Sequence, residues 1–484
     1  MLFNSYIFVL AFLPICVAGY FALNHFGKFT LAQIFLLGMS LWFYGYNNIY
    51  YLFVIIASVV INYCIYNLII KCKGNKCAKA FMIAGVIVNI GILLYFKYMD
   101  FFIDNINTAF KTDIGFLRIA LPLGISFFTF QQIGFVIDAY REEIPKYNFL
   151  NYAGFVTFFP QLIAGPIVSH DELIPQFSDS GKKKLNMDNL AGGIYIFVIG
   201  LAKKVLIADV LGKLVSYGYN VPDYLDSLSA VIVMLAYTFQ LYFDFSGYCD
   251  MATGIGKMLN IDLPQNFDSP YKALTITEFW ERWHKTLTRF FTKYVYIPLG
   301  GNRKGAVRTY VNVMIVFLLS GFWHGASWNF VFWGGIHGLF VVITRKFSGF
   351  FNKLHPALNW LITFSFVNVT WVFFRADTFS QAITILGKAV SWDFSGVDTA
   401  LFELVSLPEL SEILSIFSLE QRYPPILLTA YFAVALFTVL SSRNACEKMQ
   451  SFRPTVFNMM TTLFLLVWSV FSFAGVSVFL YFNF

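Results

Sequence analysis

The chain has 484 residues, of which 58% are hydrophobic and only 13% are charged, and its mean hydropathy is +0.65. Soluble domains carry about 25% charged residues, so this composition and the repeated apolar runs of roughly 20 residues exclude a soluble protein and predict a polytopic membrane protein. The net charge of +7 lies largely in short loops, which indicates membrane orientation and lipid contact rather than nucleic-acid binding.

The first 100 residues predict four membrane spans. No basic region precedes the first apolar run and no small-residue cleavage site follows it, so we expect a retained span rather than a signal peptide. Four lysines in the loop 71–79 predict that this loop faces the cytoplasm, which places the N-terminus outside. The segment 98–118 is expected to be an amphipathic piece on the outer face. The four spans lie near 5–24, 31–47, 49–69 and 80–98.

Two glutamine-bearing segments follow, and each is interrupted by prolines and glycines. The segment 121–141 carries Gln131, and the segment 155–177 carries Gln161. Irregular backbone survives at membrane depth only where protein or a water-filled cavity surrounds it. We therefore expect two broken helices that line a cavity, with simple packing kinks as the alternative.

A polar cluster interrupts the apolar run that begins with a span expected at 226–243. Carboxylates in such surroundings need partners, and we expect Lys257 or the region of Arg282 to supply them. Lys203 and Lys204, in a span expected near 190–212, are predicted at a surface or a helix end, where long stems reach toward water. The cluster consists of Tyr242, Asp244, Ser246, Tyr248 and Asp250. Its acids either line a substrate cavity or serve as structural partners, as Asp244 would for Arg282.

Two Trp-His pairs, Trp283-His284 and Trp323-His324, lie on either side of a basic loop and a hydrophobic span. Thr275, three residues before a glutamate, predicts a capping box that opens one amphipathic helix with His284 on its apolar stripe. The segment 307–343 predicts a hairpin with basic residues at both ends and an elbow just after His324. That geometry places His324 away from the cytoplasmic surface.

The histidines are the sharpest candidates for chemistry. A neutral imidazole at depth can accept a hydroxyl proton, as general-base acyl transfer requires. A structural hydrogen bond to a neighbouring helix is the alternative for His324, and a structural or interfacial role is the alternative for His284. We expect His337 to be a packing residue. The segment-end histidines His25, His170 and His355 are expected to be solvated.

Other reaction classes fit the sequence poorly. It contains no H-E-x-x-H or comparable metal-ligand spacing, no Walker A motif and no G-x-S-x-G motif. We therefore expect no metal and no bound cofactor. The remainder of the chain predicts spans near 357–374, 424–442 and 456–480, with a partly amphipathic region at 376–423. No clean internal repeat is visible, which argues against an inverted-repeat transporter, although a transporter or a scaffold of a polymer-export complex stays open as an alternative.

Six blocks of this sequence resemble the membrane-bound O-acyltransferase (MBOAT) family, and within it the alginate O-acetylase branch of bacterial polysaccharide acetylases. The blocks are LPLGISFFTFQ (121–131), FFPQLIAGPI (158–167), YFDFSGYCDMATGIGKMLN (242–260), FWERWHKTLTRFF (279–291), YIPLGGNRKG (296–305) and SGFWHGASWNFVFWGGIHG (320–338). The resemblance implies one acyltransferase domain over 1–484, with core motifs at 121–338 and spans at 1–100 and 345–484. It also implies an all-α ring of ~11–13 tilted, partly broken membrane helices around a thin central layer.

The resemblance further implies that His324 is catalytic and that His284 lines the same route across the membrane. The expected activity is acetyl transfer, in the bacterial cytoplasmic membrane, from a cytoplasmic thioester such as acetyl-CoA to a hydroxyl outside the cell. The acceptor would be an alginate-like exopolysaccharide, peptidoglycan, or an accessory acetyltransferase protein that completes the transfer, while teichoic acid, lipid or protein stay open. The expected cavity-lining residues are Gln131, Gln161, Tyr242, Asp244, Ser246, Tyr248, Asp250, Arg282, Trp283, Trp323 and Asn329.

Overall fold

The structure, a computed structural model, describes residues 1–394, 396–405, 423–475 and 479–480. All regular secondary structure in these ranges is helical, and seven of the helical runs found there are long and apolar enough to cross a membrane. The protein is an all-α polytopic membrane protein, which confirms the fold class predicted from composition. The seven runs are Phe8–His25, Ile49–Lys71, Lys76–Phe110, Ser227–Met258, Ala306–His324, Pro356–Arg375 and Tyr423–Leu440.

The N-terminal region folds into four helical runs at the positions of the four predicted spans. The fourth run differs from the prediction, because it continues past residue 98 to Phe110. No proline or glycine interrupts residues 92–110, so nothing ends the helix where the amphipathic piece was expected to start. The elements are η1 (Phe8–Phe12), α1 (Leu13–His25), α2 (Phe29–Gly45), α3 (Ile49–Lys71), α4 (Lys76–Leu93), η2 (Leu94–Tyr98) and α5 (Met99–Phe110).

The two glutamine-bearing segments fold differently from each other. The first forms one continuous helix, α6 (Ile125–Tyr140), so the predicted break inside it is wrong. Its irregular backbone is confined to the residues before the helix, where Gly124 has φ +70°. The second segment is broken as predicted, into α7 (Phe149–Thr157), α8 (Phe159–Leu162) and α9 (His170–Ser178).

The longest helix, α12 (Ser227–Met258), lies at the centre of the protein. In its most apolar window 72% of the residues are buried inside the protein, against 22–44% in the other six candidate spans. The predicted span 226–243 and the polar cluster after it are therefore parts of one buried helix. It packs against α10 (Met187–Ala202), α11 (Asp209–Asn220) and the π-helical turn between them, η4 (Lys203–Ala208).

The amphipathic helix predicted around His284 is in fact two short helices, α13 (Ile276–Arg282) and α14 (Lys285–Phe291). The side chain of Thr275 caps α13, as the sequence predicts. The prediction of a single helix is wrong because Trp283 is extended and His284 has φ +47°, a left-handed conformation that ends one helix before the next begins.

The predicted hairpin is formed by α15 (Ala306–His324) and α16 (Trp328–Lys346). Gly321 and Gly334 face each other where the two helices cross. A Cβ atom added at either position would lie 2.3 Å from a backbone carbonyl oxygen of the other helix. The two backbones are therefore in direct contact, as small residues permit in membrane helix pairs.

The C-terminal region contributes helices at the predicted spans and shorter helices between them. The parts of these predictions that fall on 406–422 and 476–478 lie outside the described residues. The elements are α17 (Ser348–Phe351), α18 (Pro356–Arg375), α19 (Phe379–Ala389), α20 (Thr399–Glu403), α22 (Tyr423–Leu440), α23 (Ala445–Gln450) and α24 (Val456–Phe471).

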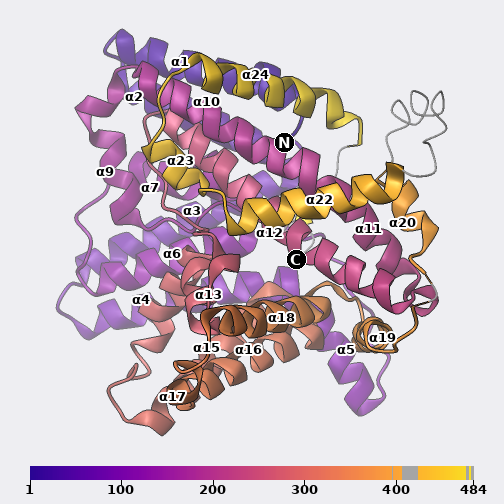
Figure 1. Cartoon of the computed structure of the whole chain (residues 1–484). Helices are drawn as coiled ribbons and strands as arrows, with labels where there is room; N and C mark the ends of the chain where they lie inside the picture. Colours follow the sequence, from indigo (N-terminus) through magenta and orange to yellow (C-terminus); the bar gives the residue numbers. More distant parts are fainter. Residues whose placement is uncertain (395, 406–422, 476–478, 481–484) are drawn as a thin grey trace.

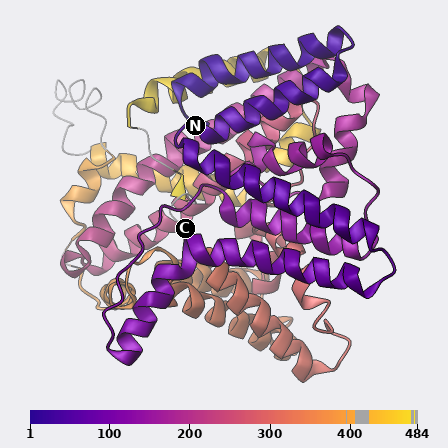
Figure 2. The ribbon, with the colours of Figure 1, turned by 180° about the vertical axis from the view of Figure 1, so that it is seen from behind.

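The α15–α16 hairpin and helix α1 lie at opposite ends of the molecule, with the central helix between them. In Figure 1, α15, α16 and α18 lie together at the bottom, α1 and α24 lie at the top, and α12 lies between them. Seen from behind, α1 to α4 run side by side across the molecule (Figure 2). The α15–α16 hairpin thus packs on α18, which itself contacts the central helix α12.

Candidate active site

His324 is the last residue of α15, and it is buried, with only 3% of its surface exposed. Three aromatic rings enclose its imidazole. The ring centroids of Trp323, Trp333 and Phe374 lie 4.9, 5.3 and 5.2 Å from that of the imidazole. Such an enclosure excludes bulk water, and polar interactions made inside it are therefore stronger than in solution.

The last turn of α15 is held by side chains from η2. The final carbonyl groups of a helix have no partner within the helix itself. Here the Tyr98 hydroxyl donates to the carbonyl oxygen of Phe322 at 2.8 Å, and Lys97 Nζ donates to those of Trp323 and His324 at 2.7 and 3.1 Å. A cation at a helix C-terminus is also favoured by the helix dipole. The backbone at His324 is thus fixed from outside its own helix.

His284 is equally buried, and its hydrogen bonds define its tautomer. Its Nδ1 lies 3.1 Å from Asn266 Oδ1, while the Asn266 amide nitrogen donates to Cys249 Sγ at 3.3 Å. Thr286 Oγ1 accepts from the Ile167 amide at 2.9 Å and donates to the same Asn266 oxygen at 2.8 Å. An amide oxygen only accepts, so the proton of His284 lies on Nδ1 and Nε2 is the proton-accepting atom.

The two histidines belong to one site. The indole of Trp323 lies between them, with its centroid 4.9 Å from that of His324 and 6.2 Å from that of His284. The imidazoles are therefore no farther apart than the sum of these two distances. Phe245 packs against His284 as well, at 5.0 Å. The structure thus brings together the two pairs that are forty residues apart in the sequence.

A cavity of about 180 Å³ lies beside α14, the helix that begins directly after His284. Its lining includes Gln131 of α6 and Thr286, which also binds the asparagine that holds His284. Neither catalytic candidate is among its lining residues. Arg289 and Lys293 line it too, and each is bound by a carboxylate, Arg289 by Glu172 at 2.5 Å and Lys293 by Asp138 at 3.0 Å.

The carboxylates of the polar cluster on α12 are paired with the two lysines of η4. Asp244 Oδ1 accepts from Lys204 Nζ at 2.5 Å, and Asp244 Oδ2 accepts from the backbone N–H of Leu480 at 3.0 Å. Asp250 accepts from Lys203 at 2.6 Å. These buried ion pairs join η4 to the central helix.

The partners predicted for those acids are wrong. Arg282 pairs with Glu278 one turn earlier in α13, at 2.9 Å, and Lys257 pairs with Asp262, also at 2.9 Å. The two η4 lysines were expected to reach toward water, but Lys204 is buried and Lys203 is only 13% exposed, because η4 packs directly against α12. Asp244 therefore has Lys204 as its partner rather than Arg282.

The other predicted cavity residues are buried at several places around α12 and the hairpin. Tyr242 lies with its ring centroid 6.3 Å from that of Trp283, which is packed among aromatic rings. Ser246 is buried in α12, and Tyr248 stacks on Phe3 at 4.8 Å. The amide nitrogens of the remaining three donate to backbone carbonyl oxygens: Gln131 to Val168 at 3.4 Å, Gln161 to Phe155 at 2.8 Å and Asn329 to Ala376 at 2.8 Å.

Two further histidines have structural roles. His337 accepts from Trp280 Nε1 at its Nδ1 (3.3 Å), and its Nε2 lies 2.9 Å from Thr370 Oγ1, so both ring nitrogens are used and the predicted packing role is confirmed. His170 was expected to be solvated, and this is wrong. It is buried against α6, with its ring centroid 5.8 Å from that of Phe135 and its Nε2 3.3 Å from a carboxylate oxygen of Asp138.

Sequence reasoning missed four residues of the site: Lys97, Tyr98, Asn266 and Thr286. A role for Lys97 could have been predicted, because it is the one charged residue in the predicted span 80–98. No sequence pattern points to Asn266, since it lies in a loop of mixed polar and apolar residues and its partner His284 follows 18 residues later.

Comparison with known proteins identifies the family. Residues 135–378, which include both histidines, match the model of the membrane-bound O-acyltransferase family, MBOAT. The chain belongs to this family. It is 45% identical over 416 residues to a peptidoglycan O-acetyltransferase of Helicobacter pylori, covering 80% of this chain and 79% of the relative.

Two further relatives have lower sequence identity to this chain. A probable alginate O-acetylase of Pseudomonas aeruginosa is 36% identical over 438 residues, covering 87% of this chain and 82% of the relative. A teichoic acid D-alanyltransferase of Bacillus subtilis is 27% identical over 280 residues, covering 53% and 69%. The protein is therefore an O-acyltransferase embedded in a membrane, and the family predicted from the six sequence blocks is confirmed.

Proposed function

We propose that this protein is an O-acetyltransferase of the bacterial cytoplasmic membrane that acetylates peptidoglycan. The enclosed imidazole of His324, held at the elbow of a membrane hairpin, is the observation that carries the chemistry. The similarity to the Helicobacter pylori enzyme, greater than that to the alginate O-acetylases, favours peptidoglycan over an alginate-like exopolysaccharide. The lysine-rich loops 71–79 and 182–184 support a cytoplasmic position for these loops and an outer position for the N-terminus.

In this proposal His324 is the general base. Its imidazole accepts the proton of the acceptor hydroxyl as the oxygen attacks the carbonyl carbon of the acetyl thioester. The new carbon–oxygen bond forms, the carbon–sulfur bond breaks, and the departing thiolate takes the proton back from the imidazolium. General-base assistance of this kind contributes about 10²–10⁴-fold to the rate. His284, with Nε2 as its proton acceptor, lies on the donor side and is oriented by Asn266.

The donor is a cytoplasmic acetyl thioester, and we expect acetyl-CoA. The cavity beside α14 supports an approach of the donor from this side, because Arg289 and Lys293 there are cations suited to phosphate groups. Gln131 and Thr286 offer polar atoms along the same lining. Both cations are bound by carboxylates in this structure, so a phosphate would compete with Glu172 and Asp138 for them.

The acceptor hydroxyl belongs either to the glycan itself or to a serine of an accessory extracytoplasmic acetyltransferase that completes the transfer. The two routes share the first step at His324. They differ in whether the purified protein alone acetylates glycan, because the relay requires its second protein. An acetylation assay with and without an extract of the extracytoplasmic compartment separates them.

The test of the proposed function is His324→Gln, with His355→Gln as the matched control. His355 is exposed and caps α18 through its ring nitrogen, far from the site. We expect His324→Gln to lower ester-linked acetate on peptidoglycan by at least ~10²-fold at an equal amount of folded protein, and His355→Gln to leave it unchanged. Full acetylation by the folded His324→Gln variant would show that the mechanism is wrong. Unchanged peptidoglycan acetate in cells that lack the whole protein would refute the proposed acceptor.

A further inference from the structure

A large groove runs between α1 and α10, at the end of the molecule opposite the α15–α16 hairpin (Figure 1). Its volume is about 1230 Å³, which exceeds the ~300–1,000 Å³ typical of pockets for small molecules. One wall is a stripe of apolar residues spaced four apart along η1 and α1, and the other wall comes from α10. The stripe is Val9, Leu13, Val17 and Phe21, and the facing residues are Leu190, Ile194 and Phe197.

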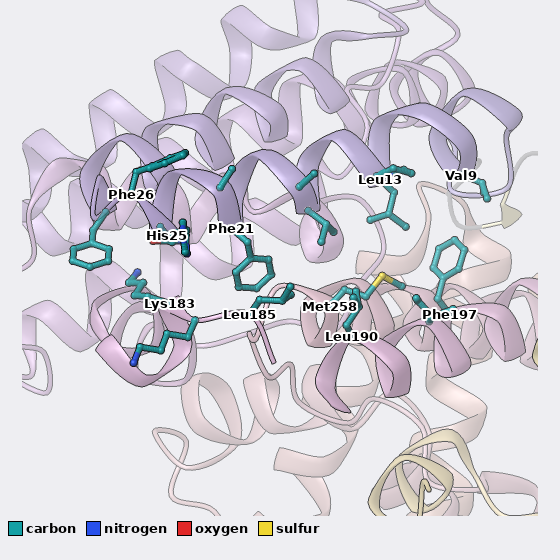
Figure 3. A pocket seen from close by; sticks show the side chains of 18 of the residues that line it. Val9, Leu13, Phe21, His25, Phe26, Lys183, Leu185, Leu190, Phe197 and Met258 are labelled. Atoms are coloured by element: carbon teal, nitrogen blue, oxygen red, sulfur yellow. The ribbon is translucent and has the colours of Figure 1, made fainter. Parts of the chain in front are cut away.

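The groove has the length of a lipid and two chemically different ends. From Val9 to His25 the helix rises ~24 Å, most of the ~30 Å hydrocarbon core of a bilayer. Figure 3 shows Val9 and Phe197 at one end of the groove and His25 with Lys183 at the other. Lys184 lines the same end as part of the basic loop. The groove is therefore apolar along its length and basic at the end that positive-inside reasoning assigns to the cytoplasm.

Lys183 and Lys184, at this end of the groove, form no ion pair with an acidic side chain of the described residues. Their neighbour Lys182 binds Asp262 at 2.5 Å. Lys183 instead donates to the backbone carbonyl oxygen of Phe177. Burial lowers the pKa of the Lys183 ammonium, and the carboxylate of Asp179 offsets this only in part, so a bound anion at this position would stabilise its charged form.

We propose that this groove is a binding site for one anionic phospholipid of the cytoplasmic leaflet. Its acyl chains would lie between α1 and α10, and its phosphate would bind Lys183 and Lys184. In a bilayer an apolar gap of this size is filled by hydrocarbon, because its walls would otherwise lose their packing contacts. The lysines add the selection for an anionic headgroup, since basic residues at the cytoplasmic surface attract anionic lipids.

The experiment measures lipid retention by native mass spectrometry of the purified full-length protein titrated with equal amounts of phosphatidylglycerol and phosphatidylcholine. We expect one phosphatidylglycerol to be retained in preference to phosphatidylcholine. The double variant Lys183→Gln/Lys184→Gln should weaken phosphatidylglycerol binding by about tenfold or more and remove the preference. The matched control, Lys346→Gln/Lys353→Gln, removes the same charge near α17, at the other end of the molecule (Figure 1), and should bind like the wild type.

A second variant tests the apolar part of the groove. Ala18 lines the groove and is exposed to it, so Ala18→Phe fills the space without disturbing a packed core. We expect it to lose the retained lipid regardless of headgroup, at an unchanged elution volume in size-exclusion chromatography. Equal phosphatidylglycerol binding by the double-lysine variant and the wild type would overturn the proposal. Retention of the lipid by Ala18→Phe would overturn it as well. So would a wild-type dimer that Ala18→Phe dissociates without loss of lipid, because the groove would then be a protein interface.

Discussion

Replacing Lys97 by methionine tests whether the backbone at His324, the proposed general base, must be held from outside its own helix. Methionine keeps most of the apolar stem of lysine and removes its three N–H donors. The change deletes the hydrogen bonds to the carbonyl oxygens of Trp323 and His324. Hydrogen bonds from a charged donor are worth ~1.5–3 kcal/mol each, so roughly 3–6 kcal/mol of local interaction is lost.

The effect on overall stability is expected to be much smaller than this loss. Burying an ammonium group costs several kcal/mol of desolvation, and the methionine variant avoids that cost. We therefore expect the free energy of unfolding to change by only about 1–2 kcal/mol. The carbonyl groups at the elbow are nevertheless left without their donor, and a displacement of ~1 Å at a reacting group lowers a rate by ~10²-fold. Lys97→Met should thus impair catalysis far more than folding.

The assay is acetyl transfer from acetyl-CoA to peptidoglycan by protein reconstituted in vesicles, with folded protein counted by size-exclusion chromatography. For Lys97→Met we expect kcat to fall by ~10²-fold. The KM for the donor should change little, because Lys97 does not line the cavity proposed for the donor. Tyr98→Phe, which loses one neutral hydrogen bond of ~0.5–1.5 kcal/mol, should reduce kcat by about tenfold or less. Lys79→Met, at an exposed position on α4, is the control. The reasoning is refuted if folded Lys97→Met retains half of the wild-type kcat.

Three further changes probe other parts of the structure. Asn266→Ala removes the acceptor that sets the tautomer of His284, so we expect a ~10–100-fold loss of acetylation. Asn266→Asp retains an acceptor oxygen, so it should keep most of the acetylation activity. Gly321→Val places side-chain atoms against the backbone of α16, and it should abolish the folded peak in size-exclusion chromatography, whereas Gly349→Ala should not. Lys204→Met removes the cation that Asp244 and Asp209 share, which leaves the buried Asp244 carboxylate with the Leu480 N–H as its donor among the described residues. We expect a cost of ~3–5 kcal/mol in thermal unfolding, of which Lys204→Met/Asp244→Leu should recover a part, since Asp209 still lacks its lysine. Stability of the single variant equal to that of the double would contradict this.

The sequence predicted those features that arise from local pattern. The spans, the α15–α16 hairpin and the cap at Thr275 each follow from residues close together in the chain. The break in the helix at His284 could not be predicted in this way, because a histidine with φ +47° violates its own backbone preference and is held there by Asn266 and the surrounding rings. The apolar stripe around His284 fits a single helix equally well.

The partners of the buried charges could not be predicted either. Sequence reasoning placed Asp244 and Asp250 at a site that requires cations, which is correct, but it chose Arg282 and Lys257 because Lys203 and Lys204 were expected to reach toward water. The cations are in fact the lysines of η4, some 40 residues earlier, which a π-helical turn aims at α12. No role was predicted for Lys97, because its carbonyl partners lie more than 220 residues away in the chain.

The contact between Gly321 and Gly334 restricts how this enzyme can open. Because the backbones of α15 and α16 touch there, the two helices cannot slide along each other without steric overlap. His324 on one helix and Trp333 on the other are therefore carried as a single rigid unit. In the proposed reaction the acceptor would reach the imidazole through displacement of neighbouring elements, such as α18 with Phe374, rather than by separation of the hairpin. A disulfide that joins α15 to α16 should consequently leave turnover intact, whereas one that joins the hairpin to α18 should slow it.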